Sequence, residues 1–240
     1  MKFIIKENYD EVAEAANEEM RRILTSADSL TIGLATGSSP IGLYKLMAKD
    51  NAEGITDFTK VTTFNLDEYI GLPTDHPETY RNFMNKNLFN QININLNKTH
   101  LPYASDKNDK NSCEEYEKML NNYQLDVQLL GIGSNGHIGF NEPGSSFSSN
   151  THIVELTEKT RNDNQRFFAS LDEVPTHAIT MGIASIMRAK EIILIACGEN
   201  KAQAIYEMAN VAKTEEIPAT ILQNHPNVIC IVDKDAASKL

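Results

Sequence analysis

Short apolar runs alternate along the chain with longer segments in which apolar side chains recur every three or four residues. Runs of the first kind predict buried strands, whereas a recurrence near 3.6 residues predicts helices that bury one face. Within residues 9–26, for example, Val12, Ala16, Met20 and Ile23 share one helical face. The pattern predicts strands at residues 3–5, 30–35, 60–66, 127–130, 192–196 and 228–232, and helices at residues 9–26, 40–46, 80–89, 113–123 and 201–208.

This alternation predicts an α/β fold. Because the strands are continuously apolar, we expect a doubly wound, mostly parallel, Rossmann-like sheet with helices on both faces. Residues 91–97 alternate strictly between polar and apolar side chains and predict a short edge strand or an extended loop. No repeat, low-complexity linker or domain boundary is visible, so we expect residues 1–240 to form a single domain.

Composition and charge narrow the class of protein. The formal net charge of −11 argues against a nucleic-acid partner, and an anionic substrate would need a local positive site. Residues 1–6 lack the long apolar stretch of a signal peptide, and no apolar run approaches transmembrane length. The three cysteines have no disulfide or metal-ligand spacing, which suits the cytoplasm. We expect Cys197 and Cys230 to be inert core residues.

The most informative segment is Gly131-Ile-Gly-Ser-Asn-Gly-His-Ile-Gly-Phe-Asn-Glu-Pro-Gly144, which follows a predicted strand. Its glycines allow the backbone to approach a ligand closely, and its polar tip carries His137 and Glu142. Loops at the carboxyl ends of parallel strands are where open α/β sheets bind ligands. A glycine-rich connection with incidental polar residues is the alternative interpretation.

Three further segments carry candidate binding groups. Residues 36–40, Thr-Gly-Ser-Ser-Pro, connect a predicted strand to a helix, where backbone N–H groups bind anions or a serine simply caps the helix. Asp67 and Glu68 follow another strand and, on extended backbone, must point in opposite directions, so only one can face a cleft. Arg166 and Lys201 could supply positive charge, although isolated basic residues usually lie on the surface.

Five motifs, in order along the chain, together resemble the glucosamine-6-phosphate deaminases. They are Ala35-Thr-Gly-Ser-Ser-Pro-Ile-Gly-Leu-Tyr44, Asn65-Leu-Asp-Glu-Tyr69, the Gly-Leu-Pro-x-x-His-Pro-x-x-Tyr of residues 71–80, the segment at 131–143, and Leu222-Gln-x-His225. The resemblance implies the fold shared with 6-phosphogluconolactonases. It also implies conversion of glucosamine 6-phosphate to fructose 6-phosphate and ammonia, in amino-sugar catabolism, with no metal or organic cofactor.

The resemblance also implies roles for individual residues. Asp67 matches the general base that moves the proton of C2, His137 matches the residue that assists ring opening, and Glu142 matches its carboxylate partner. The phosphate-binding set is matched by Thr36, Gly37, Ser38, Arg166 and Lys201, and residues 160–174 resemble a mobile lid. Asn135 departs from the family pattern, which has aspartate there; an amide can orient the imidazole but cannot stabilise its charge.

Regulation is the other point at which the chain departs from the family. Hexameric relatives bind an activator, N-acetylglucosamine 6-phosphate, through basic residues. The corresponding positions in this chain are occupied by His152 and Val154. Valine cannot bind phosphate, so we expect a monomer or small homo-oligomer without allosteric activation.

Two other functions stay open at this point. One is a 6-phosphogluconolactonase-like hydrolase, against which the motifs at Asp67 and Glu142 argue. The other is a non-catalytic sugar-phosphate sensor. Such a sensor would be expected to carry a helix-turn-helix, and none precedes the first predicted strand.

Overall fold

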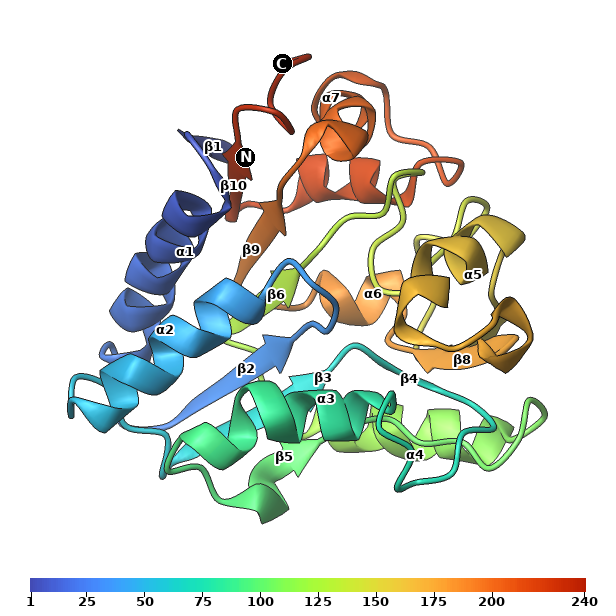
Figure 1. The fold of residues 1–240 in the computed structure, drawn as a ribbon, viewed down its shortest axis with the longest axis horizontal. Coiled ribbons are helices and arrows are strands. Elements are labelled where there is room, and N and C mark those ends of the chain that lie inside the picture. The colour runs from blue at the N-terminus through green and yellow to red at the C-terminus, as the bar shows by residue number, and fades with distance from the viewer.

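The computed structural model describes residues 1–240 and contains a central sheet of seven strands, all parallel to their neighbours. The strand order is β1-β10-β9-β6-β2-β3-β5 (Figure 1). The α/β prediction is therefore confirmed. The strands are β1 Lys2–Lys6, β2 Leu30–Leu34, β3 Val61–Asn65, β5 Thr99–His100, β6 Val127–Leu130, β9 Glu191–Ala196 and β10 Val228–Asp233.

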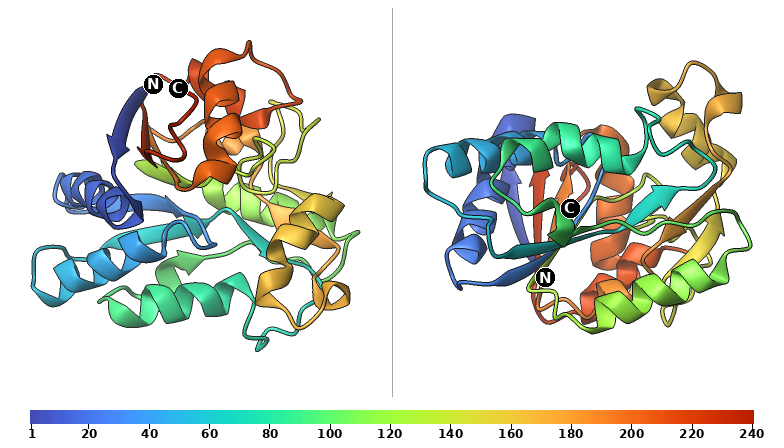
Figure 2. Two further views of the ribbon diagram at one scale, coloured as in Figure 1. Left: turned by 45° about the horizontal axis from the view of Figure 1, so that its top comes forward. Right: turned by 90° about the horizontal axis from the view of Figure 1, so that it is seen from below.

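Helices cover both faces of this sheet, with α3 and α4 on opposite sides of it (Figure 2). Each predicted helix is present, with ends shifted by a few residues, as is usual where capping decides the boundary. The helices are α1 Tyr9–Leu24, α2 Ile41–Ala52, α3 Tyr80–Asn87, α4 Lys110–Asn121, α5 Glu158–Asn164, α6 Ile183–Ile186 and α7 Ala202–Asn210. None of them combines the length and the apolar composition needed to cross a membrane.

A second, antiparallel sheet of three strands was not predicted. It has the order β4-β8-β7 and consists of β4 Asp67–Tyr69, β8 His177–Thr180 and β7 His152–Glu155. The strand predicted at residues 60–66 is β3, which ends at Asn65. After one further residue the chain enters β4 of the second sheet. Asp67 thus lies on a strand, paired with Thr180 of β8.

Of the two alternatives predicted for residues 91–97, the extended loop is confirmed and the edge strand is not. Short 3-10 turns at Phe89–Gln91 and Leu96–Lys98 flank an extended loop, and the edge strand is β5, immediately after them. The alternation instead reflects Ile94, which packs into the core, beside exposed Asn93 and Asn95.

One hydrophobic cluster of 50 buried residues fills the space between the main sheet and its helices. Close packing within the sheet explains a glycine on β2. A Cβ on Gly33 would overlap the side-chain amide of Gln128, so the glutamine side chain occupies the space over that bare backbone.

The order of the strands locates a crevice in the middle of the main sheet, at the carboxyl ends of β6 and β2. The chain leaves β2 toward β3, but it leaves β6 in the opposite direction, toward β9. Ligands bind at such a reversal because the loops after the two neighbouring strands diverge there. The loops in question are residues 36–40 after β2 and residues 131–142 after β6.

Candidate active site

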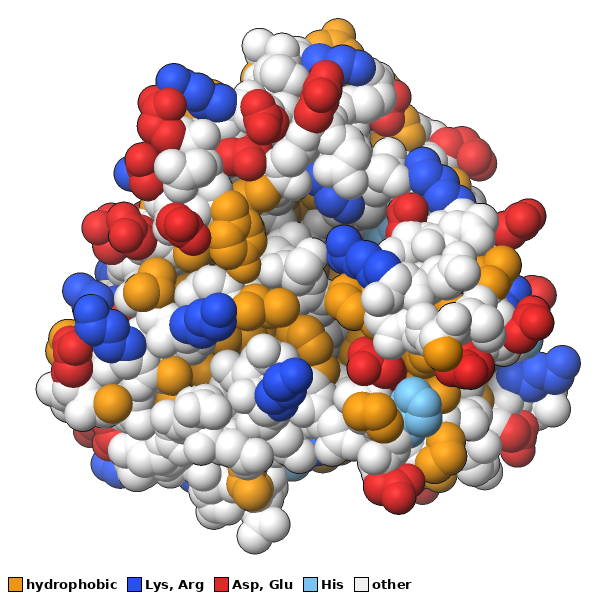
Figure 3. All heavy atoms as spheres, viewed as in Figure 1, with side chains coloured by type: hydrophobic (Ala, Val, Ile, Leu, Met, Phe, Trp, Pro, Cys, Tyr) orange, Lys and Arg blue, Asp and Glu red, His pale blue; other side chains and the backbone are white.

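A cleft of about 350 Å³ lies at this reversal, over the carboxyl ends of β9, β6, β2 and β3. In the space-filling view it is a hollow in the middle of the face, with Lys and Arg side chains beside it (Figure 3). The structure brings most of the predicted site residues to its walls. These are Thr36, Gly37, Ser38, Asp67, His137, Arg166 and Lys201.

Asp67 lines the cleft although its side chain is nearly closed off from solvent. Only 5% of the residue is exposed. Burial, and secondarily the charge of Glu68, raises the pKa of Asp67 to about 8. A carboxylate held this way is a stronger base than an ordinary aspartate, because its environment favours the protonated form.

Glu68 points away from the cleft, as the extended backbone requires. Its carboxylate accepts hydrogen bonds from the backbone N–H groups of Tyr69 at 2.8 Å and of Tyr80 and Arg81 at 2.9 Å each. The last two belong to the first turn of α3. Glu68 therefore holds the N-terminus of α3 against β4, and the prediction that only one of the two carboxylates faces the cleft is confirmed.

The loop after β6 presents the imidazole of His137 to the cleft. Its turns need left-handed backbone at Gly136 and Gly139, where φ is 80° and 59°. A Cβ on Gly133 would overlap the ring of His137, so the imidazole rests directly on the glycine backbone. The glycines in this motif thus serve the placement of the histidine.

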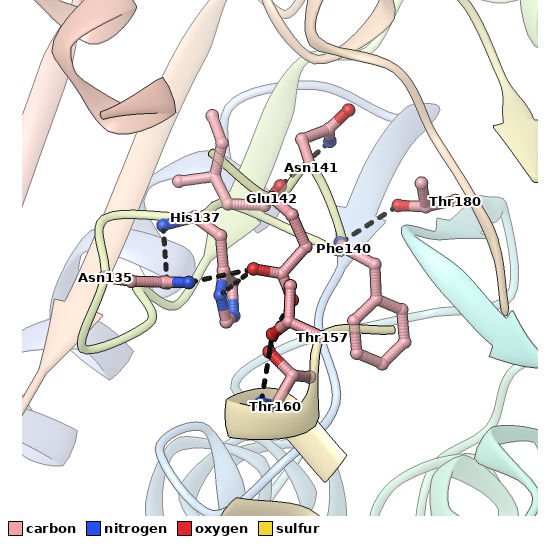
Figure 4. Close-up of polar contacts among 9 residues, drawn as sticks. Asn135, His137, Phe140, Asn141, Glu142, Thr157, Thr160 and Thr180 are labelled. Carbon is pink, nitrogen blue, oxygen red and sulfur yellow. Dashed lines mark hydrogen bonds and ion pairs between the residues drawn. The ribbon is translucent and has the colours of Figure 1, made fainter. Parts of the chain in front are cut away.

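Glu142 lies behind His137 and does not line the cleft (Figure 4). Its Oε2 is 3.5 Å from Nδ1 of His137, an ion-pair distance longer than a good hydrogen bond, and accepts a 2.8 Å hydrogen bond from Nδ2 of Asn135. Burial alone would raise the pKa of Glu142. The contact with His137 and its charge, together with donation by Thr160 and Asn135, instead lower that pKa to about 2.

The back of the same loop is fixed to the second sheet. The backbone N–H of Phe140 donates to Oγ1 of Thr180 at 3.1 Å, and Nδ2 of Asn141 donates to the carbonyl of Met181 at 2.9 Å (Figure 4). Thr180 is also the partner of Asp67 across β4 and β8. The second sheet therefore sets the position of His137 relative to Asp67.

Positive charge gathers at the other end of the cleft. Nη2 of Arg166 donates to Oγ of Ser38 at 3.2 Å, and Lys201 lies nearby at the start of α7. Burial, with the neighbouring charge of Arg166, lowers the pKa of Lys201, although Asp163 opposes that effect. Two cations beside a loop of backbone N–H groups can hold a phosphate.

The loop at residues 36–40 is supported from α1. Gly37 has φ of 92°, a conformation that suits glycine. The hydroxyl of Tyr9 donates to the carbonyl of Ser38 at 3.0 Å and accepts from the N–H of Gly42 at 2.8 Å. Tyr9 thereby links the loop to the first turn of α2.

Some residues of the cleft were not predicted from the sequence, and one was misplaced. Cys197 was expected in the core but is half-buried and lines the cleft, whereas Cys230 is fully buried as expected. The position of Cys197 in the sequence could have indicated a place in the cleft, because Cys197 directly follows β9 and precedes Gly198, which has φ of 92°. Burial raises the pKa of the Cys197 thiol to about 12, so the thiol is inert. Tyr80, the last residue of the motif at 71–80, and Thr160, the first residue of the lid-like segment, also line the cleft, although no role was predicted for either side chain.

Comparison with known proteins identifies the family. Residues 6–230 match the model of the glucosamine-6-phosphate isomerases/6-phosphogluconolactonase. A glucosamine-6-phosphate deaminase of Clostridium perfringens is 48% identical over 241 residues, covering 100% of both chains. One of Thermoanaerobacter pseudethanolicus is 49% identical over 239 residues, covering 99% of this chain and 94% of that protein.

Solved structures agree with this assignment. A monomeric glucosamine-6-phosphate deaminase superposes with a TM-score of 0.97 at 38% identity, covering 100% of both chains. The 6-phosphogluconolactonase of Trypanosoma brucei has a TM-score of 0.81 at 20% identity, covering 100% of this chain and 98% of that one, and so shares the fold. The chain is a member of the glucosamine-6-phosphate isomerase/6-phosphogluconolactonase family.

Proposed function

We propose that this enzyme converts glucosamine 6-phosphate and water to fructose 6-phosphate and ammonia, in the breakdown of amino sugars. The observation that carries the proposal is the buried carboxylate of Asp67, raised in pKa, in one cleft with His137, whose imidazole Glu142 contacts from behind. Relatives that match nearly the full chain at 48–49% identity are glucosamine-6-phosphate deaminases.

The first step in this reaction opens the pyranose ring. The proton of the C1 hydroxyl must leave and a proton must reach the ring oxygen, which an imidazole can transfer. His137 is the group in the cleft suited to this transfer. Glu142, held anionic by its donors, keeps the imidazole oriented and compensates its charge when it is protonated.

Asp67 carries the second step. In the open aldehyde the proton on C2 is acidic. As Asp67 removes this proton, the aldehyde oxygen takes one from the ammonium group of the substrate, which leaves a neutral enolamine with a C1–C2 double bond and a hydroxyl on C1. Return of the proton from Asp67 to C1 gives an iminium at C2. Water then adds to C2, and the carbinolamine expels ammonia to leave the ketone. Proton transfer by a positioned carboxyl contributes about 10²–10⁴-fold to such a rate.

The phosphate of the substrate occupies the positive end of the cleft. Arg166 offers a bidentate guanidinium and Lys201 a point charge, while Thr36, Gly37 and Ser38 offer hydroxyl and backbone donors. With the phosphate there, the sugar extends toward Asp67 and His137. The acidic molecule, with a net charge of −11, thus recognises an anion by local charge.

We also propose that the enzyme acts in the cytoplasm as one domain and as a monomer or small homo-oligomer. Its three cysteines are all unpaired, which is typical of a reducing compartment. The cleft takes its walls from segments throughout the chain, from Ala35 to Lys201. The solved relative that superposes with a TM-score of 0.97 is described as monomeric.

The test is an assay of ammonia and fructose 6-phosphate released from glucosamine 6-phosphate by the purified protein. We expect both products in equal amounts, and no more than background hydrolysis of 6-phosphogluconolactone. Lactone hydrolysis without ammonia release would contradict the proposal, as would binding of the sugar phosphate without turnover of either compound.

A further inference from the structure

The two carboxylate oxygens of Glu142 contact different parts of the molecule. Oε2 faces His137 and Asn135, within the loop after β6. Oε1 accepts hydrogen bonds from the hydroxyls of Thr160 and Thr157, the latter at 3.3 Å (Figure 4). The carboxylate proposed to orient the imidazole is thus also bound to a separate segment of the chain.

That segment, residues 157–168, forms part of the wall of the cleft and carries Arg166; we call it the cover segment. It begins with Thr157, which caps α5 by accepting from the N–H of Thr160 at 3.2 Å. It continues through α5 into a 3-10 turn at Gln165–Phe167. At its far end, the ring of Phe168 packs against Tyr69, with ring centres 5.8 Å apart.

The start of the cover segment has little else to hold it in place. The helix α5 has 7 residues, and Thr160 is the only one that is buried. A helix of this length is unstable by itself, so its position depends on tertiary contacts. Nη2 of Arg161 donates to the carbonyls of Leu171 and Val174, but these residues lie in the same excursion between β7 and β8.

We propose that Thr160 is a positioning residue that joins the two halves of the site. Its hydroxyl fixes the start of the cover segment to Glu142 and so holds Arg166 over the phosphate end of the cleft. The carboxylate that orients His137 and the cation that binds phosphate are then linked through the hydrogen bond of Thr160, beside the longer one of Thr157. The inference rests on the proposed function.

Substitution of Thr160 by valine tests this link, since valine keeps the shape of the side chain and removes the hydroxyl. We expect the KM for glucosamine 6-phosphate and the dissociation constant of inorganic phosphate, measured by calorimetry, to rise roughly 5- to 10-fold. T160S, which keeps the hydroxyl, should restore both values to within about twofold of the wild type. The matched control is T63V, because Thr63 is fully buried on β3 and its hydroxyl has no partner.

A double-mutant cycle separates this role from general support of the fold. If Thr160 acts through Arg166, then T160V should weaken phosphate binding by less than about twofold when Arg166 is already alanine. Wild-type phosphate affinity in T160V would overturn the inference, and so would an equally large effect of T160V in the R166A background. Turnover of glucosamine 6-phosphate by the wild type tests the proposed function separately. The ratios of phosphate dissociation constants between the variants test the link between Thr160 and Arg166.

Discussion

The surroundings of Asp67 oppose the ionisation of its carboxyl group and raise its pKa. Replacing Asp67 with asparagine keeps the volume of the side chain and removes the base. We expect Asp67→Asn to lower kcat about 10²–10⁴-fold with little change in KM, because the lost interaction belongs to the proton transfer. Steady-state kinetics checks this, and a kcat near the wild-type value would contradict the assignment of Asp67 as the base.

The same substitution should change stability in a pH-dependent way. The pKa of Asp67 in the folded enzyme is about 8, against about 3.9 for an unfolded aspartate. Since the folded state favours the protonated form, the stability this group provides below pH 4 is lost as the pH rises toward 8. An amide in its place does not titrate, so we expect the Tm of D67N minus that of the wild type to increase between pH 4 and 8. Thermal melts at several pH values measure this difference; a constant difference would contradict it.

Asn135 provides a third test at the scale of single residues. Its amide donates to Oε2 of Glu142 at 2.8 Å. Replacing Asn135 with aspartate would put two carboxylates in contact, and one of them must then hold a proton more tightly. We expect Asn135→Asp to move the acid limb of the kcat/KM profile upward by about one pH unit. An unchanged pH profile would show that Asn135 does not influence the charge of Glu142.

At the scale of elements, the two cations at the positive end of the cleft, Arg166 and Lys201, are held by two different parts of the fold. Arg166 lies on the cover segment, whereas Lys201 lies in the 3-10 turn between β9, a strand of the main sheet, and α7. We expect Arg166→Ala and Lys201→Ala each to raise KM about tenfold or more, because a charged hydrogen bond to phosphate is lost. Inorganic phosphate should compete with the substrate in the wild type.

The control for this pair is Lys98→Ala, at the 3-10 turn before the edge strand β5 and outside the cleft. It removes a positive charge without touching the site. If all three variants lost affinity alike, the effect would come from the overall charge of the protein. If neither R166A nor K201A changed KM, the phosphate site would be placed wrongly.

At the scale of the whole molecule, the structure bears on regulation. Val154 lies on β7 and packs against the cluster of Tyr69, Phe140, Leu156 and Ala178, and Nδ1 of His152 is 2.8 Å from the carbonyl of Asn150. An apolar side chain at this position cannot bind a phosphate. We expect hyperbolic kinetics that N-acetylglucosamine 6-phosphate does not change. A sigmoidal curve that this compound makes hyperbolic would contradict the expectation.

The sequence by itself determined six of the seven strands of the main sheet, five of the helices and the loops that carry the site. Apolar runs and helical periodicity are local, so β2, β6 and β9 and the glycine-rich loops after them could be read directly. The opposite directions of Asp67 and Glu68 followed from extended backbone alone. The motifs around His137 and Asp67 also carried the resemblance to the family.

Only the tertiary structure decided how these parts act on one another. The strands of the second sheet are 3–4 residues long, too short for a clear period, and they exist because β8 pairs with both β4 and β7. Thr160 reaches Glu142 across 18 residues of sequence, and Cys197 lies in the cleft because β9 ends there. The raised pKa of Asp67 depends on burial by distant segments. Such properties arise from packing between residues far apart in the chain, which a local pattern does not encode.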